Sequence, residues 1–299
     1  MAPGRHPGSP TNPDANRPRR AHCEDLMTET ILVATDGSAD GNSAERLGIN
    51  LAARLRGRVA GISVIEDANI RPPDSQGLSL PPYPEANLAA YYRARADAIA
   101  ARFGERARAE GVDAGCEIAQ GRADDRIVEK TQNFDLLAIG RDGRLAENKG
   151  ALIGSNTESI IRKTSKSTVV VPFGTPVSGP IVLGFDGSPG SRIAASMTVE
   201  LANSLAEPVH VFVDSKDKGR AVARFEEVRQ LLGGLTQPMR EISSTLGRPD
   251  VKIVDTAREV RAGLIVMGAF GRNRITEFFL GSNAAAVVRT APVAVLLAR

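Results

Sequence analysis

The sequence predicts an α/β protein made of two tandem doubly wound domains, each a five-stranded parallel sheet with helices on both faces. Three observations predict this fold class. The chain has 299 residues, which is enough for two domains. The segment ILVATDGS at 31–38 recurs as IVLGFDGS at 181–188, which indicates an internal duplication. Nearly continuous apolar runs alternate with helical patterns, as is typical of parallel strands buried on both faces.

The duplication sets the expected domain boundaries. Residues 27–173 are expected to form the first domain, 174–180 a linker and 181–299 the second domain. Residues 1–26 hold five prolines and almost no large apolar side chain. They are therefore expected to be a disordered tail, or to precede a true start at Met27. The linker lies within the segment PFGTPVSGP at 172–180, whose prolines and glycines are typical of a connecting segment.

Each half is expected to begin and end with a strand and to alternate strand and helix between them. In the first half, strands are expected at 31–34, 59–65, 116–119, 136–139 and 168–171. The helix after the first strand carries an apolar stripe with spacings of three and four residues. This stripe occurs twice, as Ala44, Leu47, Leu51 and Leu55 and as Ala194, Met197, Leu201 and Leu205.

The halves differ mainly after their second strand. The first half carries a proline-rich segment at 71–84, and then a helix with a stripe formed by Leu88, Tyr92, Ala96, Ile99 and Phe103. This region is either a lid or partner surface, or an extended crossover with aromatic anchors. Loop-length statistics favour the crossover.

Composition excludes several classes of function. The net charge of +3 gives little attraction for nucleic acid. No run approaches the roughly 20 apolar residues of a membrane span. Cys23 and Cys116 are the only cysteines, so no disulfide framework is expected and a reducing cytoplasm is the expected compartment. The three histidines lack the spacing of metal ligands, so no protein metal site is expected.

A glycine pattern near the C-terminus predicts a phosphate site. In GAFGRNRITEFFLGSN, a GxxG formed by Gly268 and Gly271 is followed after nine residues by Gly281 and Ser282. Glycines bring backbone N–H groups close to a ligand, and the start of the following helix favours an anion. Asp186 ends the first strand at the same sheet edge, where a carboxylate can bind ribose hydroxyls or a phosphate-bridging cation. The alternative is that these residues only cap helices, with Ser282 as an N-cap and Ser155 and Glu158 as a capping box.

The strand-DGS openings, the GxxG and GS pattern and the closing APVAVLLA resemble a tandem universal stress protein of the ATP-binding subclass. The resemblance covers essentially all of residues 27–299 as two consecutive copies of the domain. It implies an adenine nucleotide alpha hydrolase-like fold. It also implies ATP as the cofactor, with Mg²⁺ or Mn²⁺. In such a protein the glycines and the start of the last helix would hold the phosphates. The acid after the first strand would hold the ribose, and the backbone at the end of the second strand would hold the adenine. In the second half these roles fall on Gly268, Gly271, Gly281, Ser282, Asn283, Asp186, and Val213 or Asp214.

In the first half the corresponding residues are Asp36, Val64, Gly140, Gly143, Gly154, Ser155, Asn156 and Thr157. Here ten residues instead of nine separate GxxG from GS, and Asp142 lies inside the GxxG. A carboxylate there repels phosphate unless it is turned away, or unless Arg144 or Lys149 compensates for it. ATP is therefore expected to bind more tightly in the second half.

The expected function is that of an ATP-binding stress-response regulator or nucleotide sensor. The chain has no Walker sequence and no dinucleotide fingerprint. Because no histidine is placed to activate Ser38 or Ser188, the chain is not expected to be an enzyme, beyond very slow ATP hydrolysis at most. The alternative is a dimeric interaction scaffold that binds no nucleotide. In the resembled family the last strands pair between subunits, so here they are expected to pair within the chain, with further homodimerisation of the whole.

Overall fold

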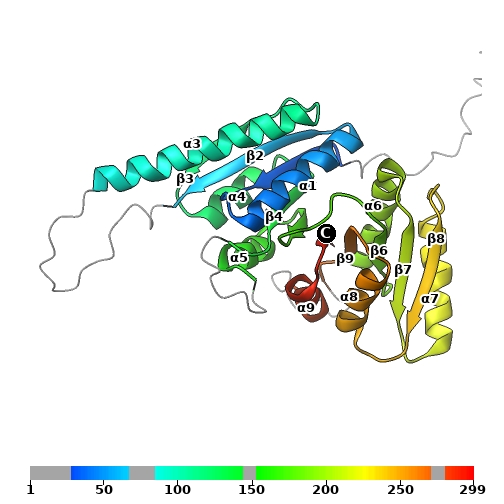
Figure 1. Ribbon diagram of the computed structural model, residues 1–299. Helices are drawn as coiled ribbons and strands as arrows, with labels where there is room; N and C mark the ends of the chain where they lie inside the picture. Colours follow the sequence, from blue (N-terminus) through cyan, green and yellow to red (C-terminus); the bar gives the residue numbers. More distant parts are fainter. Residues whose placement is uncertain (1–27, 67–84, 144–152, 271–279) are drawn as a thin grey trace, which may run out of the picture.

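The computed structural model describes residues 28–66, 85–143, 153–270 and 280–299. Each half alternates strand and helix as expected, and the two halves lie side by side with the C-terminus between them (Figure 1). The first half contains β1 (Thr30–Ala34), α1 (Ala39–Leu55), β2 (Arg58–Ile65), α3 (Glu85–Ala109), β3 (Cys116–Gln120), α4 (Ala123–Thr131), β4 (Leu136–Gly140), α5 (Ser155–Lys163) and β5 (Ser167–Val171). The second half contains β6 (Ile181–Gly184), α6 (Pro189–Leu205), β7 (Val209–Asp214), α7 (Lys218–Leu231), β8 (Met239–Ser244), α8 (Pro249–Glu259), β9 (Leu264–Gly268), α9 (Ser282–Thr290) and β10 (Ala294–Ala298).

The strands form one sheet with the order β3-β2-β1-β4-β5-β10-β9-β6-β7-β8. Within each half all neighbouring strands are parallel. The halves meet through an antiparallel pair, β5 and β10, in which Val169 lies opposite Leu296. The expected pairing of the last strands within the chain is therefore confirmed, and it removes the two apolar edges that each half alone would expose.

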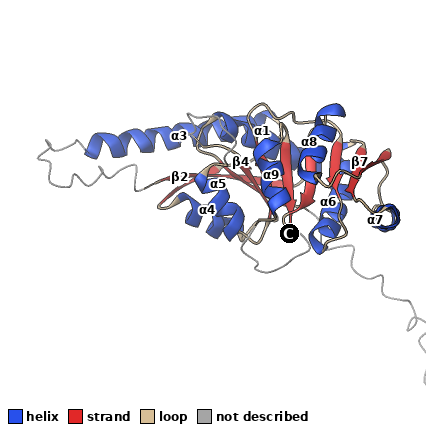
Figure 2. Cartoon of the chain, turned by 90° about the horizontal axis from the view of Figure 1, so that it is seen from below, coloured by secondary structure: helices blue, strands red, loops and turns tan. Residues whose placement is uncertain are grey.

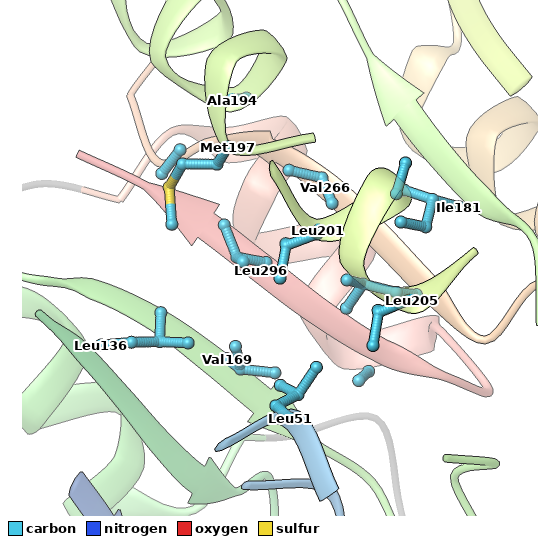
Figure 3. Close-up of a cluster of buried hydrophobic side chains, with 14 of the residues drawn as sticks. Leu51, Leu136, Val169, Ile181, Ala194, Met197, Leu201, Leu205, Val266 and Leu296 are labelled. Carbon is cyan, nitrogen blue, oxygen red and sulfur yellow. The ribbon is translucent and has the colours of Figure 1, made fainter. Parts of the chain in front are cut away.

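Helices cover both faces of the sheet because alternate strand residues point to opposite sides. In Figure 2 the strands of the first half lie between α1 and α3 on one side and α4 and α5 on the other. On the first face, one apolar core runs across both halves: Leu51 and Val169 pack in the same cluster as Leu201 and Leu296 (Figure 3). A shared core of this kind holds the two halves together as one packed unit.

The connection between the halves is packed against both of them. Thr175 is buried and its hydroxyl donates to the carbonyl of Pro172 at 2.8 Å. The amide of Gly174 donates to Ser43 in α1, and the amide of Gly179 donates to Glu207 after α6. Residues 174–180, which the composition predicts to be a linker, are thus tied to α1 on one side and to the end of α6 on the other.

Two arginines cross between the halves and bind the C-terminal ends of helices. Arg141, after β4, donates to the carbonyls of Arg289 and Ala291 at the end of α9. Arg299, after β10, donates to the carbonyls of Ile161 and Thr164 at the end of α5. Cations are favourable at helix C-termini because unpaired carbonyls gather there. Each half therefore caps a helix of the other.

The first half buries a charged cluster that the second half lacks. Glu45 in α1 is fully buried and accepts hydrogen bonds from Thr35, Arg102 and Arg106. The positions 150 residues later hold Phe185 in place of Thr35 and Ala195 in place of Glu45, and both are buried in the apolar core. The equivalent positions thus hold a buried charge in one half and apolar side chains in the other.

Cys116, at the start of β3, is expected to be an unreactive thiol. Burial, with a further effect from the charge of Glu45, raises the pKa of Cys116 to about 12. Because the thiolate is the reactive form, iodoacetamide should modify Cys116 at pH 8 roughly 1,000-fold more slowly in the folded protein than in urea. Mass spectrometry of the Cys116 peptide measures this rate, which should rise with pH up to about 12. Equal rates in folded and unfolded protein would contradict the assignment.

Among the described residues, no helix combines the length and apolar character needed to cross a membrane. Four sequence-based expectations fall on residues outside the described ranges, so the structure does not test them. They are the disordered tail at 1–26, the segment 71–84, the compensating charges of Arg144 and Lys149, and the phosphate role of Gly271.

Candidate nucleotide site

The two DGS segments form equivalent turns at the carboxyl edge of the sheet. In each, the acid follows a central strand and its Oδ1 accepts the amide N–H two residues later, at 2.9 Å for both Asp36 to Ser38 and Asp186 to Ser188. The intervening Gly37 and Gly187 have φ of 75° and 76°, a conformation that favours glycine. The serine then caps the next helix: Ser38 accepts from Gly41 at 3.0 Å, and Ser188 accepts from Ser191 at 3.2 Å. Each motif therefore fixes a carboxylate at the strand end.

The first glycine of each GxxG serves close packing of strand against helix. A Cβ on Gly140 would lie 2.8 Å from the amide nitrogen of Gly41 at the start of α1. A Cβ on Gly268 would lie 2.8 Å from the amide nitrogen of Ser191 at the start of α6. Both distances are too short for real contacts, so only glycine fits. This packing explains the two glycines without any ligand.

The GS pairs open helices α5 and α9, and their serines are not N-caps. The N-cap residues are Gly154 and Gly281, the helices begin at Ser155 and Ser282, and neither helix start has a side-chain cap. The expected capping box of Ser155 and Glu158 and the expected N-cap at Ser282 are therefore wrong. The reason is that each glycine is held as the N-cap by a backbone bond: Gly154 donates to Arg141 at 3.1 Å and Gly281 donates to Ala269 at 3.0 Å. The first amides of both helices are left uncapped by side chains, as in anion sites at helix starts.

The first half has a hollow that gathers its candidate residues, called here the first cavity. It consists of a space of about 340 Å³ and an adjoining one of about 100 Å³. Asp36, Val64, Gly143, Asn156 and Thr157 line both parts. Gly154 and Ser155 line the larger part and Gly140 the smaller. All eight first-half candidates thus meet at one place, although Thr157 uses its hydroxyl to donate to the carbonyl of Gly140 at 2.9 Å.

The charge of Asp142 is compensated by a residue that the sequence reasoning missed. Arg141 Nε lies 3.1 Å from Asp142 Oδ2. The amide of Asp142 donates to Asp40 at 3.1 Å, which fixes the turn. The adjacent guanidinium offsets the repulsion between this carboxylate and an anion. The compensation therefore includes Arg141, which also binds the end of α9.

Helix α3 supplies a wall of the first cavity that was not assigned to the site from the sequence. Tyr92, Arg95, Ala96 and Ile99 all line it. Arg95 Nη2 donates to the carbonyl of Asp36 at 2.6 Å, so a guanidinium lies at the carboxyl edge. The stripe of Tyr92, Ala96 and Ile99 was visible in the sequence, but its spacing does not show that part of the stripe faces a cavity. Residues 71–84, on which the choice between a lid or partner surface and an extended crossover depends, lie outside the described ranges, so this choice stays untested.

The second half has an equivalent hollow of about 230 Å³, called here the second cavity. Asp186, Asp214, Gly268, Gly281, Ser282 and Asn283 line it. Val213 does not, because it is fully buried in the core on the other side of the sheet. Asp214 is therefore the second-strand candidate that reaches the site. Arg224 of α7, also missed from the sequence, lines the cavity and donates to the carbonyl of Asp214 at 2.8 Å.

Within the residues that the structure describes, no three His, Cys, Asp or Glu side chains are grouped as a metal site. In each cavity one of the lining carboxylates, Asp36 or Asp186, lies between the second-strand end and the helix start. A single carboxylate is enough for a cation that takes its remaining ligands from phosphates and water. The donor set thus suits Mg²⁺ or Mn²⁺ arriving with a nucleotide.

Comparisons with known proteins agree with the fold. The universal stress protein family model matches residues 27–172 and 178–299. A universal stress protein of Synechocystis sp. is 24% identical over 177 residues, which is 58% of this chain and 61% of that protein. One from Thermus aquaticus is 34% identical over 133 residues, covering 40% of this chain and 97% of that protein. The alignment with the Synechocystis protein thus spans less than two thirds of that protein.

Among solved structures, a universal stress protein from Archaeoglobus fulgidus superposes with a TM-score of 0.71 at 18% identity. The match covers 91% of this chain and 99% of that one, so the two folds agree across both halves. The family model covers nearly all of residues 27–299 in two consecutive matches. The chain therefore belongs to the universal stress protein family.

Proposed function

We propose that this chain is an ATP-binding universal stress protein that acts in the cytoplasm as a stress-response regulator or nucleotide sensor. One observation carries the proposal: each half has a cavity at the carboxyl edge that joins an acid, a second-strand end and a helix start without a side-chain cap. Along the sheet the second-strand end, the acid and the helix start follow one another, which suits base, ribose and phosphates in turn.

The first cavity is the proposed ATP site. It is the larger of the two, at about 340 Å³ in its main part against about 230 Å³, and each cavity is lined by one arginine, Arg95 in the first and Arg224 in the second. The amides of Ser155, Asn156 and Thr157 open α5 and suit the phosphates. Because the side chain of Val64 is apolar, the backbone of this residue is the group that binds adenine in this proposal. The nine-residue spacing predicts tighter ATP binding in the second half, whereas the described geometry favours the first.

The chain's own residues suit binding better than turnover. Asp36 is positioned to hold the ribose or, together with the phosphates, a Mg²⁺ or Mn²⁺ ion. Efficient phosphoryl transfer also needs cations placed around the transferred group, beyond a single acid. Very slow hydrolysis is the most that we propose.

The competing function is a dimeric scaffold without nucleotide. Its strongest support was the apolar last strand of each half, but β5 and β10 pair with each other in the middle of the sheet. The sheet edges in this chain are β3 and β8. Homodimerisation thus stays a proposal, and it does not need the last strands.

Perchloric-acid extraction of the purified full-length protein, followed by nucleotide chromatography, tests the proposal. We expect co-purified ATP, or a rise in Tm when ATP and Mg²⁺ are added to emptied protein, because a ligand that binds only the folded state stabilises it. A protein that carries no nucleotide and shows no ATP-dependent shift would support the scaffold instead.

A further inference from the structure

The two cavities differ most where the second strand of each half ends. Ile31 pairs with Val59 in the first half, and Ile181 pairs with Val209 in the second, so the duplicated strands share one register. Val64 lies five residues after Val59, and Asp214 lies five residues after Val209, so the two residues occupy equivalent positions in the two halves. The first cavity thus presents an aliphatic side chain where the second presents a carboxylate.

The Asp214 carboxylate lacks a donor on one side. It lines the second cavity, and its Oδ1 is shielded from water without a hydrogen-bond partner among the described residues. A buried oxygen of this kind is unfavourable until a donor meets it. The backbone carbonyl of the same residue already accepts from Arg224 at 2.8 Å. At this strand end the acceptor in need of a donor is therefore the side chain.

A further carboxylate, that of Asp250, lines the second cavity. Helices α4 and α8 correspond, with Asp124 and Asp250 both second in their helices. Asp124 is tied to α5 by Lys163 and Ser159, each at 2.7 Å, and it does not line the first cavity. The positions in α9 that match Ser159 and Lys163 hold Ala286 and Thr290.

Without a lysine from α9, Asp250 lines the second cavity, and its one recorded ion pair is with Arg248 at 3.4 Å. The lining of the second cavity therefore includes the carboxylates of Asp214 and Asp250 and the apolar side chains of Phe212 and Ile253. A flat ring that carries hydrogen-bond donors on one edge suits such a surface.

We propose that the second cavity binds a guanine nucleotide, with Asp214 as the residue that selects the base; this rests on the proposed nucleotide-binding function. Guanine presents two neighbouring donors, N1–H and the C2 amino group, which the Asp214 carboxylate accepts together once its rotation turns the shielded Oδ1 toward the cavity. Adenine presents an N1 lone pair beside its amino group, and this lone pair is repelled by the carboxylate. Sites that pair a buried polar group with a substrate donor discriminate strongly against analogues that lack it.

The rest of the second cavity suits a nucleotide in this orientation. In the sheet, β6 lies between β7 and β9. Asp214 ends β7, Asp186 follows β6, and Ser282 opens α9 beyond β9. A guanine at Asp214 thus directs its ribose to Asp186 and its phosphates to the amides at the start of α9.

Equilibrium dialysis of the full-length protein with labelled GDP tests the proposal. At the second cavity we expect ADP to compete at least about tenfold more weakly than unlabelled GDP. Asp214→Asn should weaken GDP binding at least about tenfold and favour xanthosine diphosphate, whose C2 carbonyl accepts from an amide. Asp217→Asn is the matched control. The side chain of Asp217 caps α7 by accepting from the backbone amide of Arg220 at 3.1 Å. Because asparagine caps a helix as well as aspartate does, GDP binding should not change.

The outcomes separate this proposal from the one on which it rests. If ADP and GDP compete equally at both sites and Asp214→Asn changes neither, the guanine assignment is overturned while nucleotide binding stands. If neither labelled GDP nor labelled ATP binds the wild-type protein, nucleotide binding itself fails. Retention of GDP by Asp214→Asn at wild-type affinity, with normal Tm, would also overturn the assignment.

Discussion

Replacing Gly154 by valine is expected to weaken ATP binding at the first cavity by about 100-fold or more. A Cβ at this position would lie 3.2 Å from both the carbonyl oxygen of Arg141 and the amide nitrogen of Gly143. The branches of valine therefore push against the turn or into the cavity that Gly154 lines. Loss of two charge-assisted hydrogen bonds to phosphate, each about 1.5 kcal/mol, accounts for a change of this size.

Gly115→Val is the matched control, because a Cβ there meets nothing within 4 Å and Gly115 is absent from the residues that line either cavity. Equilibrium dialysis with labelled ATP measures both variants, and thermal unfolding checks that both are folded. Unchanged ATP affinity in a folded Gly154→Val protein would remove the phosphate role of the α5 start.

Glu45→Gln is expected to lower the free energy of unfolding by about 3 kcal/mol, the scale for breaking a buried ion pair. Glu45 is fully buried, and it holds both Arg102, with Nη2 to Oε1 at 2.6 Å, and Arg106. A neutral amide leaves both guanidinium groups without their counter-charge and turns two donors toward them. Because the arginine side chains are about a third exposed, water offsets part of the loss.

Asp97→Asn makes the same chemical change in an exposed pair. Asp97 lies 3.2 Å from Arg93, one turn away on α3, and both side chains are more than half exposed. Such pairs contribute only about 0.3 to 0.5 kcal/mol. Urea unfolding of the two variants measures the difference, and equal losses would show that the Glu45 cluster does not stabilise the first half.

The arrangement of strands followed closely from the sequence. The structure has all five expected first-half strands, with ends that differ by at most one residue. Four of them are largely apolar runs, as is typical of buried parallel strands, whereas β3 is a half-exposed edge strand. The repeat predicted the second half, and the resemblance to the family predicted the pairing of β5 with β10. The two halves are not separate sheets, however, and their common core depends on contacts such as Val169 with Leu296, which lie far apart in the sequence.

The site was predicted in its position more than in the role of each residue. Glycines were assigned to phosphate, but Gly140 and Gly268 let α1 and α6 approach the sheet, which requires knowledge of the packing. Arg95 and Arg224 come from helices whose approach to the strand ends is a tertiary feature. Alignment of the two halves shows that Val64 and Asp214 occupy equivalent positions. That Asp214 lines a cavity becomes known only from the structure.

A crystal structure of the full-length protein grown with ATP and MgCl₂ tests the central claim most directly. We predict density for ATP in the first cavity, with phosphates at the amides of residues 155–157, ribose at Asp36 and adenine at the backbone of Val64. Clear density for these residues with no nucleotide at saturating ATP, or ATP bound away from the carboxyl edge of the sheet, would contradict it.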